Sequence, residues 1–542
     1  MQAWFCGLLV LALLGGIVSG LPVFVVLLGV PLAVAGLGTL VGAFDPGYLA
    51  AFPQRVFGLA GNTLLVAVPL FVLMGLLLER SRTAERMLVV MAHLLGGSRR
   101  GLVLAVLIVS ALIAASTGII GATIVMLGLI SLPAMRRAGV PVRLASGLVC
   151  ASGTLGQIIP PSIVLILLGD QISTTYLQAQ HAAGNFAPEP VSVADLFAGA
   201  LLPGLLLVLL YGAYALARLW LDDRRDFPVG TGVVKNEAGR PDPFAGTAGG
   251  QGVASAGSAE VDADTTGSLW ATFVPPMLLI GSVLGSILLG VATPTEAAAI
   301  GAGGALLLAA SQLGDERFAG AAHVAVIATG AALALVVLRN LAPQGAGAAL
   351  RTGVPLVLLL AIALGLLGSA AVLQRRRLLV PVLLDTVQIT GMIFGIVIGA
   401  SMLSLVFRGF GGDELVSTAL EALPGGDHTL LLAVLLLIFV LGFLLEFVEI
   451  IFIVVPLIGP TLLASGFDPV WLGILIAMNL QTSFLTPPFG FALFYFRSVA
   501  PPGLSTLGLY RAVLPFVALQ VLALCCVYAF PPLATWLPGL ID

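Results

Sequence analysis

The feature that most constrains this chain is a set of long runs without a charged residue. One run extends from Gly101 to Met135, a second from Thr386 to Phe407 and a third from Thr352 to Gln374. A helix of about 20 apolar residues crosses the hydrocarbon layer of a bilayer. Because lipid offers no hydrogen bonds to the backbone, runs that meet lipid must be helical. We therefore expect an all-α polytopic integral membrane protein.

Composition supports this class and argues against others. Only 9% of the 542 residues are charged, against about 25% in soluble domains. A β-barrel would show short alternating segments instead. No basic cluster with interleaved aromatic residues indicates nucleic-acid binding. The cysteines and histidines lack ligand spacing, and no nucleophile and base or HExxH motif indicates an enzyme, so we expect neither a metal-binding cluster of these residues nor catalysis. The cysteines are Cys6, Cys150, Cys525 and Cys526, and the histidines are His93, His181, His323 and His428.

Apolar runs bounded by charged, proline and glycine residues predict the spanning segments. Helices are expected near 4–20, 22–44, 62–79, 101–135, 196–220, 269–292, 294–313, 318–338, 353–374, 380–408, 429–458 and 509–530. The first run has no basic residue ahead of its apolar centre, which favours a retained helix over a cleaved signal peptide. An amphipathic segment at about 84–97 is expected to lie at the membrane interface.

Two further apolar stretches, 144–170 and 470–497, are interrupted by Pro-Pro, so neither is expected to be one straight helix. The two stretches are related by a constant offset of 327 residues. This offset maps Pro133, Gly139 and Pro160-Pro161 onto Pro460, Gly466 and Pro487-Pro488. Small, hydroxyl and amide residues precede both proline pairs. Chance spacing in a chain with 66 glycines and 33 prolines is the alternative to a repeat.

The loops that follow Pro133 and Pro460 carry opposite charge. The first contains Arg136, Arg137 and Arg143, whereas Thr461 to Trp471 has Asp468 and no basic residue. Basic loops lie on the cytoplasmic side, so the two equivalent loops are expected on opposite sides of the membrane. An inverted repeat with broken helices in both halves is typical of secondary transporters that bind their solute near the bilayer midplane.

The interruptions supply the candidate ligands. Irregular backbone at membrane depth can bind Na⁺ through its carbonyl oxygens, and neutral side-chain oxygens can add to them. The candidates in the first half are Ser152, Gly153, Thr154, Gly156, Pro160 and Pro161, and those in the second half are Asn479, Gln481, Thr482, Thr486, Pro487, Pro488 and Gly490. We expect Na⁺ to bind through these two hairpin tips.

Acidic residues within apolar runs are candidates of a second kind. Glu446 and Glu449 stand three apart, so they share a helix face, and acids inside a membrane usually have a function. A pair held by hydrogen bonds of the scaffold is the alternative. The offset maps them onto Ile119 and Ala122, which indicates an unwound segment that includes Ser116, Thr117, Gly118 and Gly121. Thr293, Thr295 and Glu296 stand at a helix start, where capping and a coupling role are both open.

Three segments resemble a known family in the order in which the family has them. Ala151 to Ser162, Thr293 to Ala299 and Leu485 to Gly490 are similar to signature segments of the large membrane subunit of tripartite ATP-independent periplasmic (TRAP) transporters. The likeness covers about residues 20–220, 270–310 and 380–537. The segment Leu445 to Ile450 resembles permeases labelled for mannitol/chloroaromatic compounds or 2-oxo acids.

The resemblance implies an elevator-type fold in the bacterial inner membrane, with two inverted repeats that each contain a re-entrant helical hairpin. It further implies Na⁺ as the coupling ion without another cofactor, a small four-helix membrane subunit, and a periplasmic binding protein that delivers a small organic anion of the carboxylate or 2-oxo-acid type. A single-component sodium/dicarboxylate symporter is the alternative, because it shares the hairpins. A channel is less consistent with an inverted repeat.

The chain then divides into five parts. The first repeat occupies 1–220 with its hairpin near 144–170, central helices occupy 269–313, and the second repeat occupies 378–537 with its hairpin near 470–497. Residues 221–268 are expected to form a flexible hydrophilic loop, since they contain few large apolar residues. Residues 314–377 are expected to add apolar segments. These two parts depart from the family pattern.

Overall fold

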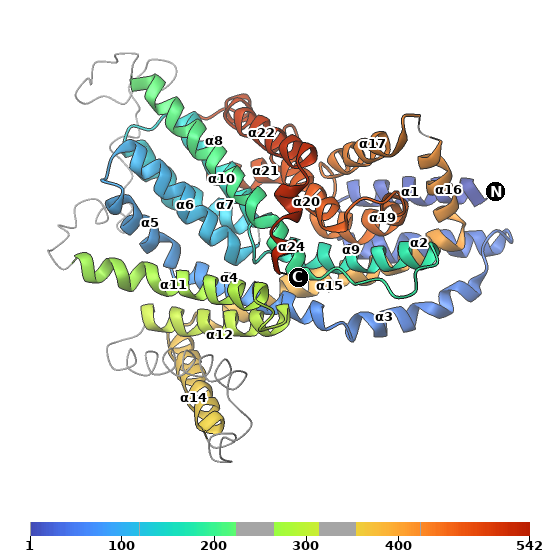
Figure 1. Ribbon diagram of the computed structural model, residues 1–542, viewed down its shortest axis with the longest axis horizontal. Helices are drawn as coiled ribbons and strands as arrows, with labels where there is room; N and C mark the ends of the chain where they lie inside the picture. Colours follow the sequence, from blue (N-terminus) through green and yellow to red (C-terminus); the bar gives the residue numbers. More distant parts are fainter. Residues whose placement is uncertain (1, 119, 224–264, 314–353, 423, 542) are drawn as a thin grey trace.

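Figure 1 shows a computed structural model that describes residues 2–118, 120–223, 265–313, 354–422 and 424–541. Every regular element in these ranges is a helix, and none of them contains a strand. The expected all-α class is confirmed. The hydrophilic loop expected at 221–268 lies for the most part outside the described residues, as does the insertion expected at 314–377 apart from α14 (Val354–Arg375).

Eight helices in the described ranges are long and apolar enough to cross a membrane. Seven of them are α2 (Val23–Leu40), α4 (Thr63–Arg80), α7 (Ile120–Arg137), α10 (Val193–Asp223), α12 (Pro294–Leu313), α15 (Leu379–Gly409) and α22 (Thr506–Ala529). The eighth is the run Phe447–Ala464, made of α18 (Phe447–Glu449), the π-helical turn η4 (Ile450–Val454) and α19 (Val455–Ala464). The polytopic membrane protein expected from composition is confirmed.

The helix order of the first half recurs in the second at the spacing found in the sequence. Adding 327 to the bounds of α4, α5 (Thr83–Leu94), α6 (Arg99–Thr117), α7 and α8 (Val142–Thr154) gives ranges that fall on α15, α16 (Gly412–Glu421), α17 (Gly426–Leu441), the run Phe447–Ala464 and α20 (Pro469–Leu485). Both proline pairs contain a cis peptide bond. The match ends beyond them, because α9 (Ile163–Ala182) has 20 residues and α21 (Phe491–Arg497) has 7.

Two helix pairs pack against equivalent helices of the two halves. α2 packs against α15 and carries α1 (Gln2–Val18) on it, and α12 packs against α4 and carries α11 (Thr265–Leu288) on it. Figure 1 shows these pairs at different places in the molecule, with α14 projecting away from α12. The helices α8, α10, α20 and α22 pack on one another in the interior, where nearly every side chain of α8 and α20 is buried.

The segment expected at the membrane interface is α5. Its buried residues, Thr83, Ala84, Met87, Leu88 and Met91, share one face, while Arg86 and His93 are exposed. With 12 residues, α5 is about 18 Å long, too short to cross the hydrocarbon layer. Its equivalent α16 has 10 residues. Both short helices lie at the same place in their halves, between a spanning helix and a broken one.

Two helices that the sequence predicts as continuous are divided, so those predictions are wrong. The run 101–135 is split into α6 and α7 at Gly118, within the segment for which unwinding was expected. The run 429–458 is split between α17 and α18. Glu446 is the N-cap residue of α18 with an extended ψ of 171°, so it does not share a helix face with Glu449. Both runs stay largely apolar through the break, which is why apolar character alone does not reveal it.

Candidate solute and ion site

The first helix break brings irregular backbone next to the first proline pair. Gly118 has a left-handed φ of +60°, which glycine adopts without strain. A Cβ on this residue would lie 3.3 Å from the backbone nitrogen of Ile163, the first residue of α9. The glycine therefore allows the break and the start of α9 to approach closely. Ser116 and Thr117 form the last turn of α6 ahead of this break.

The second helix break lies against the second proline pair in a similar way. α17 ends at Leu441, and the chain turns before α18 begins at Phe447. A Cβ on Gly442 in this turn would collide with the Ser483 hydroxyl of α20. Asn479 of α20 donates a hydrogen bond of 2.7 Å to the carbonyl of Leu435 in α17. The first break therefore packs against α9, which follows the first proline pair. The second break packs against α20, which precedes the second proline pair.

The turn at the second proline pair depends on Gly490. A Cβ there would lie 2.6 Å from the carbonyl oxygen of Phe484 and 2.9 Å from that of Thr486. Only glycine permits this approach, which keeps both oxygens beside the start of α21. The Thr486 hydroxyl donates to the Thr482 carbonyl at 2.7 Å, so its own oxygen keeps lone pairs for another partner.

The first proline pair is held by side-chain to backbone hydrogen bonds. The Ser162 hydroxyl donates to the carbonyl of Gln157 at 3.0 Å across the turn. Earlier in α8, the Ser152 hydroxyl donates to the Val149 carbonyl at 3.4 Å. A Cβ on Gly153 would collide with Ile124 of α7, so this glycine serves close helix packing.

A cavity of about 230 Å³ lies where the two breaks and the two proline turns meet. The first half contributes Gly118, Ile120, Gly121 and Ile163, the second half contributes Glu446, Phe447, Val448, Phe484, Phe491 and Tyr495, and α15 contributes Ile389, Met392 and Ile393. Residues more than 300 positions apart in the sequence therefore share one cavity. We take it as the candidate solute and ion site.

Three long helical segments begin at this cavity, and the 7-residue α21 begins there as well, at Phe491. Ile120 is the first residue of α7, Ile163 that of α9 and Phe447 that of the run Phe447–Ala464, and all three line it. A helix N-terminus carries unpaired N–H groups and a partial positive charge. Glu446 is the single charged side chain in the lining as described, and no Lys or Arg is part of it. The electrostatic field here combines one carboxylate with three positive helix ends.

Among the sequence candidates, Gly118, Gly121 and Glu446 line the cavity. The other candidates of α8 and α20 are buried in helices that lead to the proline pairs, and they do not line it. Glu449 is 2% exposed, lies outside the lining, and has no hydrogen-bond partner for its Oε2 atom among the described residues.

Sequence reasoning missed the apolar and aromatic lining. Ile163, Phe484 and Ile389 cannot be told from core residues in a chain that is 59% hydrophobic. Tyr495 could have been recognised as a candidate from the sequence, since it is a hydroxyl-bearing side chain a few residues after a proline pair. A Cβ on Gly121 would lie 2.8 Å from the Tyr495 ring, so the ring packs directly on the start of α7.

A buried group of hydrogen bonds around Thr154 joins the two halves at equivalent positions. Gln481 Nε2 donates to Thr154 Oγ1 at 3.3 Å, and these residues are 327 positions apart. Gln520 Nε2 of α22 donates to the same oxygen at 3.3 Å, while the Thr154 hydroxyl donates to the Ala151 carbonyl at 2.8 Å. One donor and two acceptor positions are thereby used, which is the full capacity of a hydroxyl. The Thr154 side chain has no lone pair left for Na⁺ in this arrangement.

Further buried polar atoms surround this group of hydrogen bonds. Tyr211 of α10 is fully buried and packs edge-on against Phe516 of α22, with ring centroids 5.4 Å apart. Its hydroxyl lies next to Gln520 and Thr154. Gln481 Oε1 and Gln520 Oε1 have no hydrogen-bond partner within the described part of the chain. Since Thr154 must accept both amide N–H groups, the two amide oxygens point away from it.

The Thr293 to Glu296 segment is a capping box at the start of α12. The Thr293 backbone N–H and hydroxyl donate to Glu296 Oε2 at 2.8 and 2.9 Å, and the Glu296 N–H donates back to Thr293 Oγ1 at 3.3 Å. Thr295 donates to the carbonyl of Thr63 at 2.7 Å, which ties α12 to the start of α4. These contacts give the segment a structural role, and it does not line the cavity.

The chain is similar to a known family of membrane transport proteins. The chain matches, over residues 7–533, the family described as "Tripartite ATP-independent periplasmic transporter, DctM component". The chain belongs to this family. It is a large permease subunit of the TRAP type, a multi-pass protein of the bacterial inner membrane. The resemblance seen in the sequence is confirmed.

Relatives of this TRAP permease serve different solutes. It is 28% identical over 521 residues to the C4-dicarboxylate TRAP transporter large permease protein DctM of Vibrio cholerae, with 95% of each chain covered. It is 24% identical over 527 residues to the sialic acid TRAP transporter large permease protein SiaM of the same organism, with 97% of each covered. Both matches extend over nearly the whole length of each chain.

The fold has a counterpart among solved structures. The YdaH transporter of Alcanivorax borkumensis superposes with a TM-score of 0.51 at 15% identity, covering 90% of this chain and 87% of that one. At this identity the likeness concerns the fold alone. The TRAP permease thus shares its helical architecture with a membrane transporter.

Proposed function

We propose that this permease carries out sodium-coupled uptake of a small organic anion of the carboxylate or 2-oxo-acid type. The observation that carries the proposal is the convergence of three helix N-termini on one cavity that also contains Glu446. Helix N-termini bind anionic groups through free N–H groups without a basic side chain. The carboxylate of the solute lies at these ends.

The carboxylate of Glu446 explains why the solute needs a cation. An anion and Glu446 in the same small cavity repel each other, and this repulsion is strong where little water screens it. A Na⁺ ion ligated by Glu446 and by carbonyl oxygens of the neighbouring breaks removes the repulsion. Transporters with broken helices bind ion and solute in this way. Solute and ion then stabilise each other in the cavity, which makes uptake depend on Na⁺.

The movement that we propose follows from the packing. The spanning helices α4 and α15, with the pairs α1–α2 and α11–α12, form a support. The helices from α6 to α10 and from α17 to α22, which form most of the cavity lining, move as one body against this support, of which α15 lines the rest of the cavity. The short helices α5 and α16 connect the two parts. The two halves have opposite orientation in the membrane, as the Arg136 to Arg143 loop and the loop with Asp468 suggest.

We further propose that this permease works with a small four-helix membrane subunit and a periplasmic binding protein that delivers the solute. The test is uptake into proteoliposomes that contain both membrane subunits, with the cognate binding protein and its solute outside. Uptake is expected only with an inward Na⁺ gradient and with the binding protein. Equal uptake when K⁺ replaces Na⁺ would contradict sodium coupling. Equal uptake without the binding protein would favour a single-component symporter.

A further inference from the structure

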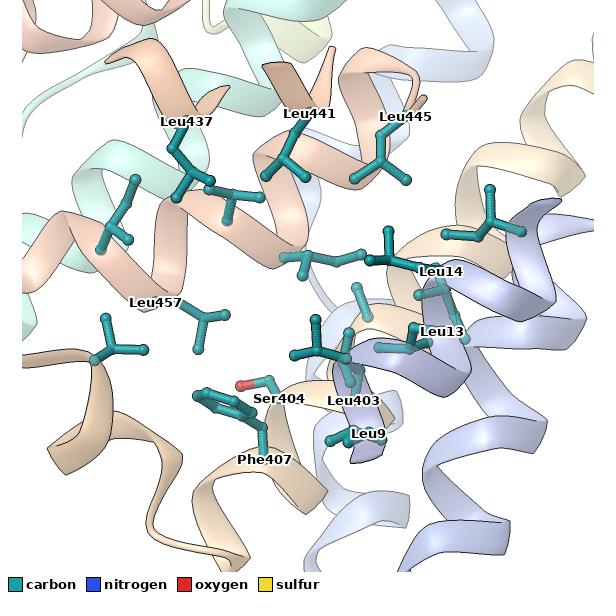
Figure 2. A pocket seen from close by; sticks show the side chains of 18 of the residues that line it. Leu9, Leu13, Leu14, Leu403, Ser404, Phe407, Leu437, Leu441, Leu445 and Leu457 are labelled. Carbon is teal, nitrogen blue, oxygen red and sulfur yellow. The ribbon is translucent and has the colours of Figure 1, made fainter. Parts of the chain in front are cut away.

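An apolar groove separate from the candidate site lies between α1 and α15 on one side and α17 and the run Phe447–Ala464 on the other. Figure 2 shows the groove, which has a volume of about 410 Å³. Of its 19 lining residues, Ser404 is the one with a polar side chain. Leu13, Leu441 and Leu457 point into it from three different helices. We call this space the α1 groove.

The α1 groove is continuous with the surface that faces lipid. Val10 and Leu437, which line it, are 47% and 46% exposed, and the adjoining Leu11 and Leu436 are 70% and 63% exposed. These residues belong to α1 and α17, apolar helices of 17 and 16 residues, and exposed apolar side chains on such helices of a membrane protein meet hydrocarbon. Whatever fills the groove therefore enters from the bilayer interior, where the available groups are lipid chains and helices of other proteins.

The equivalent place in the first half is closed. There α4, α5, α6 and α11 surround a cavity of only about 10 Å³, in which Met87 of α5 and Pro276 of α11 are part of the lining. The short helix α5 packs against α6 there, whereas α16 packs against α1, α15 and α19. The helix order that the two halves share therefore does not by itself produce the α1 groove. It is a specific opening in the second half.

We propose that the α1 groove binds one acyl chain of a membrane phospholipid. An empty apolar space of this size forfeits the dispersion contacts of its whole lining, and water does not fill it because only one polar partner is present. A transmembrane helix with side chains is about 10–12 Å wide, so 410 Å³ would hold less than one turn of it. A hydrocarbon chain is far narrower, and it matches the lining in chemistry.

The test uses photo-crosslinking of the complete permease with its small subunit in liposomes. The probe is a phosphatidylethanolamine that carries a diazirine in the middle of one acyl chain, added as a trace lipid. Adducts are mapped by mass spectrometry of proteolytic peptides. We expect adducts on Leu441 and Leu457 at least fivefold above those on the plain lipid-facing residue Leu436. Equal labelling of groove and surface would overturn the proposal.

The second part of the test uses variants whose larger side chains fill the groove. Ser404→Phe and Leu441→Phe each place a ring in the space, and either is expected to lower the groove adducts at least fivefold. Leu436→Phe is the matched control on the lipid-facing side and is expected to leave them unchanged. Thermal unfolding of the purified proteins identifies a variant that is misfolded, in which case the other variant decides. Unchanged groove adducts in a folded filled variant would refute lipid binding.

Discussion

The two halves of this permease follow one helix plan and differ in the chemistry at equivalent places. The loop between α7 and α8 carries Arg136, Arg137 and Arg143, while the loop between α19 and α20 carries Asp468. The first helix break is formed around Gly118, and the second ends at Glu446. The repeat therefore fixes where the chain is interrupted, and the individual side chains decide what each interruption can bind.

The halves also meet at equivalent positions. Thr154 and Gln481, 327 residues apart, are joined by a hydrogen bond. The helices α8 and α20, which carry these residues, pack against each other in the interior. The threonine is saturated by protein partners, whereas Thr486 near the second proline pair is not. In our proposal, this difference separates a hairpin with a structural role from one that binds Na⁺.

The largest effect is expected from a methyl group in the second proline turn. Gly490→Ala would place a Cβ within 2.6 Å of the Phe484 carbonyl oxygen, so the turn that borders the cavity must shift. In an enzyme, a displacement of about 1 Å can cost about 100-fold in rate, and a transport site depends on the positions of its groups in a similar way. We expect uptake to fall on that order. Initial rates of solute uptake into proteoliposomes measure it.

The matched control is Gly281→Ala in α11. A Cβ there meets nothing within 4 Å, so uptake should remain at the wild-type rate. Gly118→Ala, with its left-handed φ of +60°, tests the first half in the same assay and is expected to reduce uptake as well. Wild-type uptake in Gly490→Ala would mean that the second turn does not border the site.

The next effect distinguishes the two glutamates. Glu446 lines the cavity and Glu449 does not, so Glu446→Gln removes the charge that ligates Na⁺ in our proposal. An interaction with a charged group contributes about 1.5–3 kcal/mol. The Na⁺ concentration for half-maximal uptake should rise by roughly tenfold or more, since 1.4 kcal/mol corresponds to tenfold. Glu449→Gln keeps the side-chain size and should change it much less. The reverse order would move the ion from the cavity to Glu449.

The smallest effect on transport sharpens the contrast between the two threonines. Thr154→Val removes the acceptor of two buried amides, so the free energy of unfolding should fall by about 1–3 kcal/mol with unaltered Na⁺ dependence. Thr154→Ser keeps the hydroxyl and should restore stability. Thr486→Val is expected to change stability little and to be rescued by added Na⁺. Thermal unfolding and Na⁺ titration of uptake separate the two, and a sodium rescue of Thr154→Val would place the ion in the first hairpin.

Much of the architecture could be predicted because membrane constraints act on the sequence directly. Uncharged runs predict spanning helices, and the recurrence of Pro133, Gly139 and the first proline pair at one offset predicts equivalent helices. The breaks at Gly118 and before Phe447 are harder to predict, since the chain stays largely apolar through both of them. Their exact positions depend on tertiary contacts, such as that between Gly442 and Ser483.

The site was predictable only in its polar part. Gly118, Gly121 and Glu446 stood out by residue type and by offset, whereas Ile163 and Phe484 line the cavity through the way the helices pack. For Thr154, in contrast, the residue type led to a wrong expectation. Its hydroxyl suggested an ion ligand, but Gln520, distant in the sequence, turns out to share that oxygen with Gln481. No local pattern reveals such a long-range partner.

The central claim, that the two equivalent halves have opposite orientation in the membrane, is tested most directly by one accessibility measurement. Ala138→Cys and Ser465→Cys lie at equivalent positions, 327 residues apart, in a background whose four cysteines are replaced. Spheroplasts are treated with a membrane-impermeant maleimide before and after permeabilisation. We expect immediate labelling of Ser465→Cys and labelling of Ala138→Cys only after permeabilisation. Labelling of both from the outside, in variants that retain uptake, would contradict the inverted arrangement.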